Sequence, residues 1–289
     1  MKEYNQYIKE KIGRKVQKLS INIGASCPNR DGSIGVGGCA FCNNKSFSPG
    51  YCDSEKSVSQ QIREGKEFFR KKYPDMVYLA YFQSYTNTYG NTERLLAQYR
   101  EALSCDDVVG LVIGTRPDCI ADDLLDGISE IARERYVCVE LGAESIYDKT
   151  LKVINRGHTW DCTKATIRRL ADRGIEVGLH FIMGLPGETR EEMLRVSDEV
   201  SELPVSLIKL HQLQIIEDSL FGREYKEGRL DVELWKAEDY LDFCAEFVKR
   251  LRDDIVVERF TSQSPPDMVI APKWGLKNYE FMNLLRKRI

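Results

Sequence analysis

The sequence lacks the features that mark membrane, secreted and repeat proteins. No apolar run approaches the ~18 residues of a membrane-spanning helix, and the amino-terminal residues lack the apolar region of a signal peptide. The chain also contains no internal repeat and no low-complexity stretch, and no linker rich in proline or glycine interrupts residues 1–215. We therefore expect a cytoplasmic globular protein with no membrane partner.

Histidine is also scarce, and the cysteines do not suggest a disulfide framework. The 289 residues include three histidines, at positions 158, 180 and 211. The nine cysteines are odd in number and mostly isolated from one another, which fits free thiols in a reducing compartment. The length permits one large α/β domain or a core with a small appendage.

The net charge of −3 is unevenly distributed along the chain. Residues 1–20 hold six Lys and Arg against two Glu, and residues 264–289 hold five against Asp267 and Glu280. The residues between these ends therefore carry a net charge of −10. Basic ends around an acidic core could bind a phosphate backbone, although solvated ends show the same pattern.

Three of the cysteines form the most informative motif of the chain. Cys27, Cys39 and Cys42 follow a C-x11-C-x2-C spacing within one short stretch. Three thiolates can hold three irons of a cubane and leave the fourth iron open for chemistry, whereas an electron-carrying cluster usually has four thiolates. The motif therefore favours a catalytic iron–sulfur site with these three cysteines as its metal ligands.

Two other kinds of site, or no metal at all, remain alternatives on these three cysteines alone. A structural zinc site would need a second pair of Cys or His at short spacing, and every histidine lies more than about a hundred residues beyond Cys42. A thioredoxin-like C-x-x-C would follow a strand, open a helix and have no third cysteine upstream. The other six cysteines show no metal spacing, and only Cys52 lies near the motif.

Strand-like and helix-like segments alternate over residues 1–215, which predicts a parallel α/β sheet with right-handed crossovers. The expected strands are Leu19–Gly24, Met76–Gln83, Val108–Thr115, Val137–Leu141, Glu176–Met183 and Ser206–Gln214. The expected helices are Ser57–Lys72, Thr92–Leu103, Ala121–Arg133, Trp160–Arg173 and Glu188–Leu203. Six such units are fewer than the eight of a closed barrel, so we expect an open partial (β/α)6 barrel with its functional residues at the carboxyl ends of the strands.

The pattern changes after residue 215. Val232–Arg252 is typical of a helix and Ile255–Arg259 of a strand, and Ser264-Pro265-Pro266 then breaks the chain before an apolar tail with Trp274. We expect a core of residues 1–215 and a small C-terminal α/β extension, residues 216–289, that closes the open side of the barrel.

Nine short motifs, in order along the chain, carry a resemblance to a known family. They are Cys27-Pro-Asn-Arg-Asp-Gly, Gly38-Cys39-Ala-Phe-Cys42, Tyr81-Phe-Gln-Ser-Tyr-Thr-Asn-Thr88, Gly114-Thr-Arg-Pro-Asp118, Glu140-Leu-Gly-Ala-Glu-Ser145, Asn155-Arg-Gly-His158, Gly184-Leu-Pro-Gly-Glu-Thr189, Lys209-Leu-His-Gln-Leu213 and Ala271-Pro-Lys-Trp274. The chain thereby resembles the radical SAM superfamily, on the branch that includes the Elongator catalytic subunit and oxygen-independent coproporphyrinogen oxidase. Within that branch it is similar to a bacterial group of proteins of about this length.

The resemblance implies two cofactors, a [4Fe-4S] cluster and S-adenosyl-L-methionine (SAM). It implies that Phe41 flanks the adenine of SAM, that Arg156 pairs with a SAM carboxylate, and that Glu144 contacts the ribose or the amino group. Glu144 and Arg156 could instead form a surface ion pair. Relatives carry a glycine-rich turn after the second strand that binds the methionine amino group. This chain has polar residues there, so side chains or backbone carbonyls must take that role: Gln83, Thr86 and Asn87.

The candidates for contact with the substrate lie on later strands. His180 lies within the fifth expected strand and could point into the barrel lumen, although a lone histidine is more often an ordinary core or loop residue. Lys209 and His211 alternate with Leu210 on the sixth strand, so both could face the lumen. We therefore take His180, Lys209 and His211 as candidate catalytic residues.

The resemblance also implies an activity. A radical SAM enzyme cleaves SAM reductively to a 5′-deoxyadenosyl radical, which abstracts a hydrogen atom from the substrate, and reduced flavodoxin or ferredoxin is the expected electron donor. The Elongator-like branch favours tRNA as the substrate, and the similar bacterial group is connected with converting wobble 5-carboxymethylaminomethyluridine to 5-aminomethyluridine. The alternatives are a radical SAM enzyme acting on a tetrapyrrole or other small metabolite, and a non-catalytic iron–sulfur or zinc protein that senses redox state or binds RNA.

Overall fold

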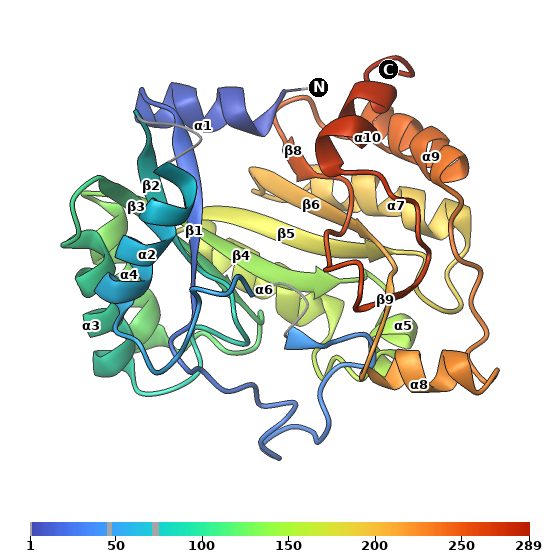
Figure 1. The fold of residues 1–289 in the computed structure, drawn as a ribbon, viewed down its shortest axis with the longest axis horizontal. Coiled ribbons are helices and arrows are strands. Elements are labelled where there is room, and N and C mark those ends of the chain that lie inside the picture. Colours follow the sequence, from blue (N-terminus) through green and yellow to red (C-terminus); the bar gives the residue numbers. More distant parts are fainter. Residues whose placement is uncertain (1, 45–47, 71–74) are drawn as a thin grey trace.

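Seven parallel strands form the framework of the protein, in the order β1-β2-β3-β4-β5-β6-β8 (Figure 1). The computed structural model describes residues 2–44, 48–70 and 75–289. The strands of this sheet are β1 (Val16–Ile21), β2 (Val77–Phe82), β3 (Val108–Thr115), β4 (Tyr136–Glu144), β5 (Glu176–Met183), β6 (Leu207–Gln212) and β8 (Val256–Arg259). The predicted open, partial α/β barrel is therefore confirmed, with strands close to their expected positions.

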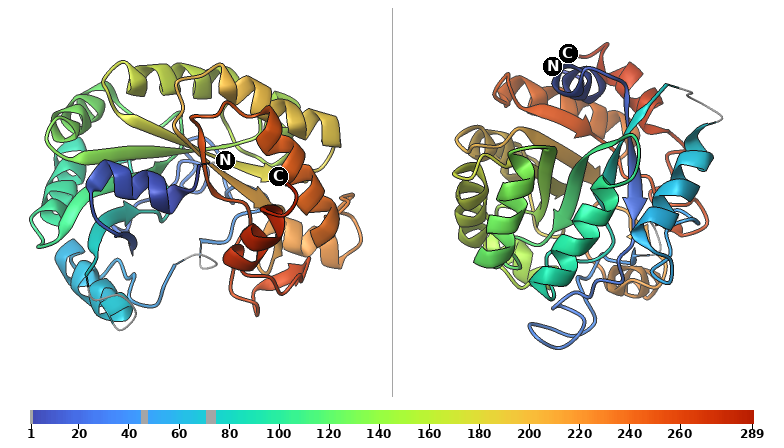
Figure 2. Two further views of the ribbon diagram at one scale, coloured as in Figure 1. Left: turned by 90° about the horizontal axis from the view of Figure 1, so that it is seen from above. Right: turned by 90° about the vertical axis from the view of Figure 1, so that its left-hand side faces the viewer.

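The helices mostly connect successive strands and cover the outer face of the sheet, except for the first helix, which precedes the first strand (Figure 2). They are α1 (Tyr4–Ile12), α2 (Val58–Arg70), α3 (Thr92–Leu103), α4 (Asp122–Ala132), α5 (Asp148–Val153), α6 (Trp160–Ala171), α7 (Arg190–Ser201), α8 (Leu220–Lys226), α9 (Ala237–Arg250) and α10 (Asn278–Leu285). The side chains of Asn91 and Thr189 cap α3 and α7, because each accepts a hydrogen bond from a backbone N–H of the first turn. The expected helix Ser57–Lys72 is present as α2, and its residues 71 and 72 lie outside the described residues.

The seventh strand comes from the segment after residue 215. β8 pairs in parallel with β6, so residues expected in a separate extension add a strand to the main sheet. The same segment forms a small antiparallel pair, β7 (Ile215–Ile216) with β9 (Val269–Ala271). Trp274 packs on the aromatic rings of Tyr240 and Phe281, and its indole N–H donates to the carbonyl of Trp235 at 2.9 Å. The apolar tail is thus held against α9 and α10.

Strand residues that point outward pack against the helices, while those that point inward form layers inside the curved sheet. The layer at the amino ends of the strands is apolar and includes Leu79, Val112 and Leu207. Tyr7 and Ile8 of α1 pack into this layer. Figure 2 shows α1 lying inside the incomplete ring that the strands form. Helix α1 therefore closes the amino end of the barrel, beside its two edge strands β1 and β8.

A buried charged layer lies above this apolar floor. The Glu140 carboxylate on β4 accepts from Lys18 on β1 at 2.8 Å, from Lys209 on β6 at 2.6 Å and from His180 on β5 at 2.9 Å. The Lys18 ammonium also contacts the carboxylate of Glu258 on β8 at 2.6 Å. Charged side chains thereby connect the two edges of the open sheet through the strand at its centre.

The neighbours of Glu140 decide its protonation state. Burial by itself would raise the pKa of this carboxyl, but the two lysines and His180 outweigh burial and hold the pKa well below its usual range. Glu140 is therefore a carboxylate at neutral pH. Its charge compensates two buried ammonium groups that would otherwise be costly to bury.

Replacing Glu140 by Gln is expected to lower the free energy of unfolding at neutral pH by about 3–5 kcal/mol, because the two buried lysines are then left with one counter-charge, Glu258, between them. The stabilisation from a depressed carboxyl pKa is complete above the usual value of 4.5 and is lost as the pH falls through the folded-state value. The difference between wild type and Glu140→Gln should therefore narrow below about pH 4.5.

Urea denaturation at neutral and acid pH measures this difference. Glu246→Gln is the matched control, because the Glu246 side chain is partly exposed and its ion pairs with Arg190 and Arg250 are solvated, so little change is expected. Equal destabilisation in the two variants, or a difference that does not depend on pH, would contradict the assignment.

Candidate active site

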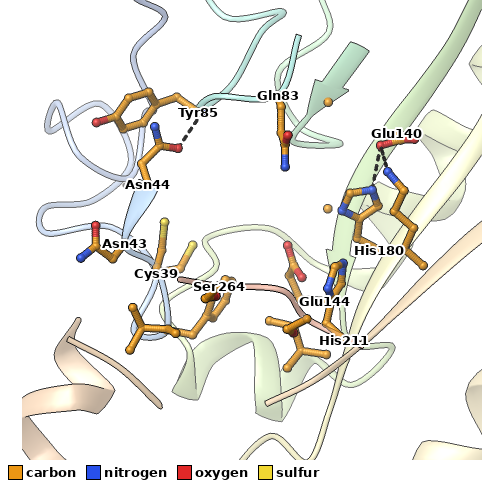
Figure 3. A pocket seen from close by; sticks show the side chains of 18 of the residues that line it. Cys39, Asn43, Asn44, Gln83, Tyr85, Glu140, Glu144, His180, His211 and Ser264 are labelled. Atoms are coloured by element: carbon orange, nitrogen blue, oxygen red, sulfur yellow. Dashed lines mark hydrogen bonds and ion pairs between the residues drawn. The ribbon is translucent and has the colours of Figure 1, made fainter. Parts of the chain in front are cut away.

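A cavity of about 270 Å³ opens at the carboxyl ends of the strands, where a parallel barrel places its functional residues. Its lining combines the cysteine loop with side chains from β2, β4, β5, β6 and β8. In Figure 3, Gln83 and Glu144 point into the space between Cys39 on one side and His180 with Glu140 on the other. Residues far apart in the sequence therefore share one cavity.

All three cysteines of the motif line this cavity: Cys27, Cys39 and Cys42. Their loop follows β1 and docks on the segment after α5, because Ala40 N–H donates to the carbonyl of Ile154 at 2.9 Å and the Asn155 amide donates to the carbonyl of Gly38 at 2.9 Å. Gly38 has a φ of 84°, and a Cβ atom there would lie 2.8 Å from the Arg30 guanidinium. Glycine is thus required for the turn that leads into Cys39.

The donors around the cysteines fit a [4Fe-4S] cluster. Within the described residues, no three His, Cys, Asp or Glu side chains lie close enough together to bind one metal ion. A [4Fe-4S] cluster does not need such a site, because each of its three cysteine thiolates binds a different iron. Arg156 donates to the sulfur of Cys39 at 3.4 Å, and the side-chain amide of Asn29 lies 3.6 Å from the same sulfur. Burial and the neighbouring Cys39 raise the pKa of Cys42 to about 11, so this thiol needs a metal to become a thiolate.

The residues expected to bind SAM mostly lie beside the cysteines. Five of them line the cavity: Phe41, Gln83, Thr86, Glu144 and Arg156. Glu144 is the last residue of β4 and has a φ of 67°, a left-handed conformation that is rare for a side-chain-bearing residue and is often found at functional sites. Arg156 is buried, donates to the carbonyl of Gly142 at 2.6 Å and lies 3.5 Å from the Glu144 carboxylate. The two residues do form the ion pair that was the alternative, but the pair is buried at the cavity and does not lie on the surface.

Two arginines and one glycine shape this side of the cavity. A Cβ atom on Gly142 would lie 2.5 Å from the Arg156 guanidinium, so glycine makes room for it. Arg116, which also lines the cavity, is 2% exposed and forms a bidentate ion pair with Asp118 at 2.9 and 2.8 Å. Its remaining nitrogen, Nη1, is buried without a hydrogen-bond partner among the described residues. A carboxylate of a bound amino-acid ligand would satisfy it.

Asn87 does not line the cavity, in contrast to the expectation that it contacts the cofactor. It is fully buried, and its amide donates to the backbone carbonyls of Phe82 at 3.0 Å and Gly114 at 2.8 Å. Asn87 therefore ties the loop after β2 to the end of β3. Its role is in the shape of the loop that carries Gln83 and Thr86.

The opposite wall carries the candidate catalytic residues. His180, Lys209 and His211 all line the cavity, and the two imidazole rings lie 5.5 Å apart between centroids. Burial lowers the pKa of Lys209, and burial together with His180 lowers the pKa of His211 well below its usual value. His211 is thus a neutral imidazole at neutral pH, next to the charged layer of the lumen.

Sequence reasoning missed several members of this wall. Tyr81 and Glu140 line the cavity, and the Tyr81 hydroxyl lies 3.3 Å from the Lys209 ammonium. Both begin motifs that the resemblance singles out, and the alternation of inward and outward residues on each strand could have placed them in the lumen. The burial of Lys18 and Glu258 could not be predicted from the sequence. It is favourable only because the fold brings these residues into contact with the opposite charges of Glu140 and Lys209.

Comparisons with known proteins agree with this geometry. A family model described as the radical SAM superfamily matches residues 21–200, and one described as the radical SAM C-terminal domain matches residues 205–289. The YtqA protein of Bacillus subtilis (strain 168) is 33% identical over 285 residues, which cover 99% of this chain and 88% of that protein.

The comparisons also found a more distant sequence relative and a similar solved structure. The tRNA uridine(34) acetyltransferase of Methanocaldococcus jannaschii is 28% identical over 169 residues, which cover 57% of this chain and 27% of that protein. The solved structure of Elp3 from Methanocaldococcus infernus matches with a TM-score of 0.70 at 16% identity, over 94% of this chain and 62% of that one. This likeness shows a shared fold.

Among the described residues, no helix is long and apolar enough to cross a membrane.

The cavity brings together three cysteines and a set of polar side chains that fit a cluster and an amino-acid-like ligand. Family models cover most of the chain, and the bacterial relative matches nearly its whole length. The chain therefore belongs to the radical SAM superfamily, and it is an enzyme that uses a [4Fe-4S] cluster and S-adenosyl-L-methionine.

Proposed function

We propose that this enzyme acts on the C5 side chain of the wobble uridine of tRNA, converting 5-carboxymethylaminomethyluridine to 5-aminomethyluridine. Loss of one hydrogen atom and one electron from the methylene beside the carboxylate would give an imine, and water would hydrolyse the imine to the aminomethyl group and glyoxylate. The hydrogen atom would leave in 5′-deoxyadenosine, and the electron would return to the cluster that supplied one for SAM cleavage. The similarity to tRNA uridine(34) acetyltransferases supports a substrate of this class. Only 27% of the M. jannaschii protein is matched, so acetyl transfer is not carried over to this chain. A reduced flavodoxin or ferredoxin is proposed as the electron donor.

In this proposal the sulfur-lined side of the cavity holds the cofactors. Cys27, Cys39 and Cys42 would bind the cluster, and five residues would bind SAM: Phe41, Gln83, Thr86, Glu144 and Arg156. When bound, the cluster and SAM supply reductive cleavage and hydrogen-atom abstraction from the substrate. The protein's own groups orient these partners, because Arg156 reaches both the sulfur of Cys39 and the carboxylate of Glu144.

The observation that carries the proposal is the pairing of two different walls across one cavity. Cys39 lies on one side and Glu140 with His180 on the other, and Gln83 and Glu144 point into the space between them (Figure 3). Lys209 and His211 line the same cavity. A reacting group between these walls would lie near SAM and against polar side chains. A wobble base that is splayed out of its loop can reach such a site, whereas a stacked base cannot.

The basic residues at the two ends of the chain, which could bind a phosphate backbone, do not line the cavity. In Figures 1 and 2 both termini lie on the side of the molecule away from the cysteine loop. Several of their cations are already paired with acidic groups: Lys2 with Glu10, Lys11 with Glu176, Lys18 with Glu140, Arg286 with Glu3, and Arg288 with Glu238. Five of the eleven basic residues of the two ends are thus engaged in ion pairs within the protein.

Replacing Cys39 by Ala is expected to abolish formation of 5′-deoxyadenosine and to reduce the bound iron and sulfide after anaerobic reconstitution. The reason is that two thiolates cannot hold the cubane as three do. Chromatography of dithionite reactions with SAM measures the product. Cys162→Ala is the matched control, since Cys162 lies outside the cavity lining and should retain both properties. A Cys39→Ala variant that still cleaves SAM would contradict the ligand assignment.

Replacing Arg156 by Lys is expected to weaken SAM binding by about 1.5–3 kcal/mol while the cluster remains, because a charge-assisted bidentate contact becomes a single one. SAM titrations followed by the electron paramagnetic resonance spectrum of the reduced cluster measure this affinity. Arg133→Lys, at the exposed carboxyl end of α4, is the control. The same SAM affinity in Arg156→Lys and wild type would exclude this role for Arg156.

An anticodon stem–loop with 5-carboxymethylaminomethyluridine at the wobble position should be converted to the 5-aminomethyl form by the reduced, cluster-loaded enzyme with SAM. Mass spectrometry of the nucleosides detects the conversion, and 5′-deoxyadenosine should accompany it. The same stem–loop with unmodified uridine is the control and should stay unchanged. SAM cleavage that leaves both RNAs intact would refute the tRNA substrate and favour a small metabolite.

A further inference from the structure

Arg259 ends the edge strand β8 and reaches the cavity because of an irregularity in the sheet. The pairing of β6 with β8 shifts at this point, so that Ile208 is opposite Val257 but Lys209 is opposite Arg259. Such a bulge lets two consecutive residues point to the same side of a strand. Glu258 accordingly contacts the lumen lysines, and the next residue, Arg259, also lines the cavity.

The charged neighbours of Arg259 are fully engaged with one another. The Lys209 ammonium lies 2.6 Å from Glu140, 3.3 Å from the Tyr81 hydroxyl and 3.4 Å from Glu258. The Arg259 guanidinium, in contrast, has no hydrogen bond or ion pair with any residue that the structure describes. It is therefore the donor on this wall that is available to a ligand.

The charge of the wall points to the kind of ligand. Lys209 and Arg259 line this wall together with Glu140, and behind them Lys18 pairs with Glu258. His211 lies within electrostatic range of Arg259, and its neutral imidazole adds a hydrogen-bonding group without adding charge. The wall thus carries one positive charge in excess, and a partly buried excess charge is favourable when an anion binds next to it.

We propose that Arg259 binds a carboxylate of the substrate, with His211 as a second hydrogen-bonding group on the same wall. This inference rests on the proposed function, because the carboxymethylaminomethyl group ends in a carboxylate and the aminomethyl product lacks one. Arg259 would therefore hold the substrate side chain between the charged layer and SAM. Loss of the carboxylate would remove this contact and favour release of the product.

The experiment compares the affinity of the SAM-bound enzyme for two anticodon stem–loops, one with the carboxymethylaminomethyl group and one with the aminomethyl group. Wild type should bind the first about 10- to 100-fold more tightly, which is the usual range for a charge-assisted contact. Arg259→Met should bring this ratio close to one, and Arg259→Lys should retain part of it. Arg133→Met, at the opposite end of the barrel, should keep the full ratio.

The ratio separates the possible outcomes. Because each protein is compared on two RNAs that share every phosphate, partial loss of folded protein cancels in the ratio. An equal loss of affinity for both RNAs in Arg259→Met would assign Arg259 to a backbone phosphate and overturn the proposal, as would an unchanged ratio. If wild type converts the RNA but Arg259→Met keeps the ratio, only this inference fails; if wild type neither binds nor converts either RNA, the proposed function fails with it.

Discussion

The burial of the Glu140 carboxylate between two lysines is the interaction on which the rest of this structure depends. A partial barrel has two free edges, and its strands would be joined only through their immediate neighbours without a contact across the lumen. Glu140 lies on the central strand β4 and contacts side chains from β1, β5 and β6, while Lys18 continues the connection to β8. The curvature of the sheet and the floor of the cavity are thereby set by the same group of charges.

The cysteine side of the site depends on a second and independent set of contacts. The loop that carries the cysteines is fixed to the turn around Asn155 by backbone and amide hydrogen bonds, and Arg156 of that turn reaches the sulfur of Cys39. The cluster ligands are therefore positioned from the end of α5, and the charged layer is positioned from the strands. The distance between the two halves of the site follows from the rigid sheet that carries both.

Much of this architecture could be predicted from the sequence, because strands buried on both faces and amphipathic helices leave clear local patterns. The three cysteines could also be identified as a motif from the sequence, because all three lie in one short loop and their spacing is visible there. Other features depend on contacts between distant residues. The four-residue strand β8 is too short for its sequence pattern to predict that it joins the main sheet. The amide of Asn87 donates to two backbone carbonyls and not into the cavity. The burial of Lys18 is favourable only because Glu140 and Glu258 lie next to it. The bulge that turns Arg259 into the cavity is likewise set by how β8 meets β6.

Helix α1 affects which substrates can bind in the cavity. Because its side chains fill the amino end of the lumen, the cavity is closed at that end and lies at the carboxyl ends of the strands, where the cysteine loop lines it. A large molecule can place only a protruding group at the closed end of such a cavity. Binding then depends on the length of the group as well as on its chemistry, because a group that is too short does not contact the charged side chains at the closed end. With the proposed tRNA substrate, the depth of the cavity would thus discriminate between nucleoside side chains of different length.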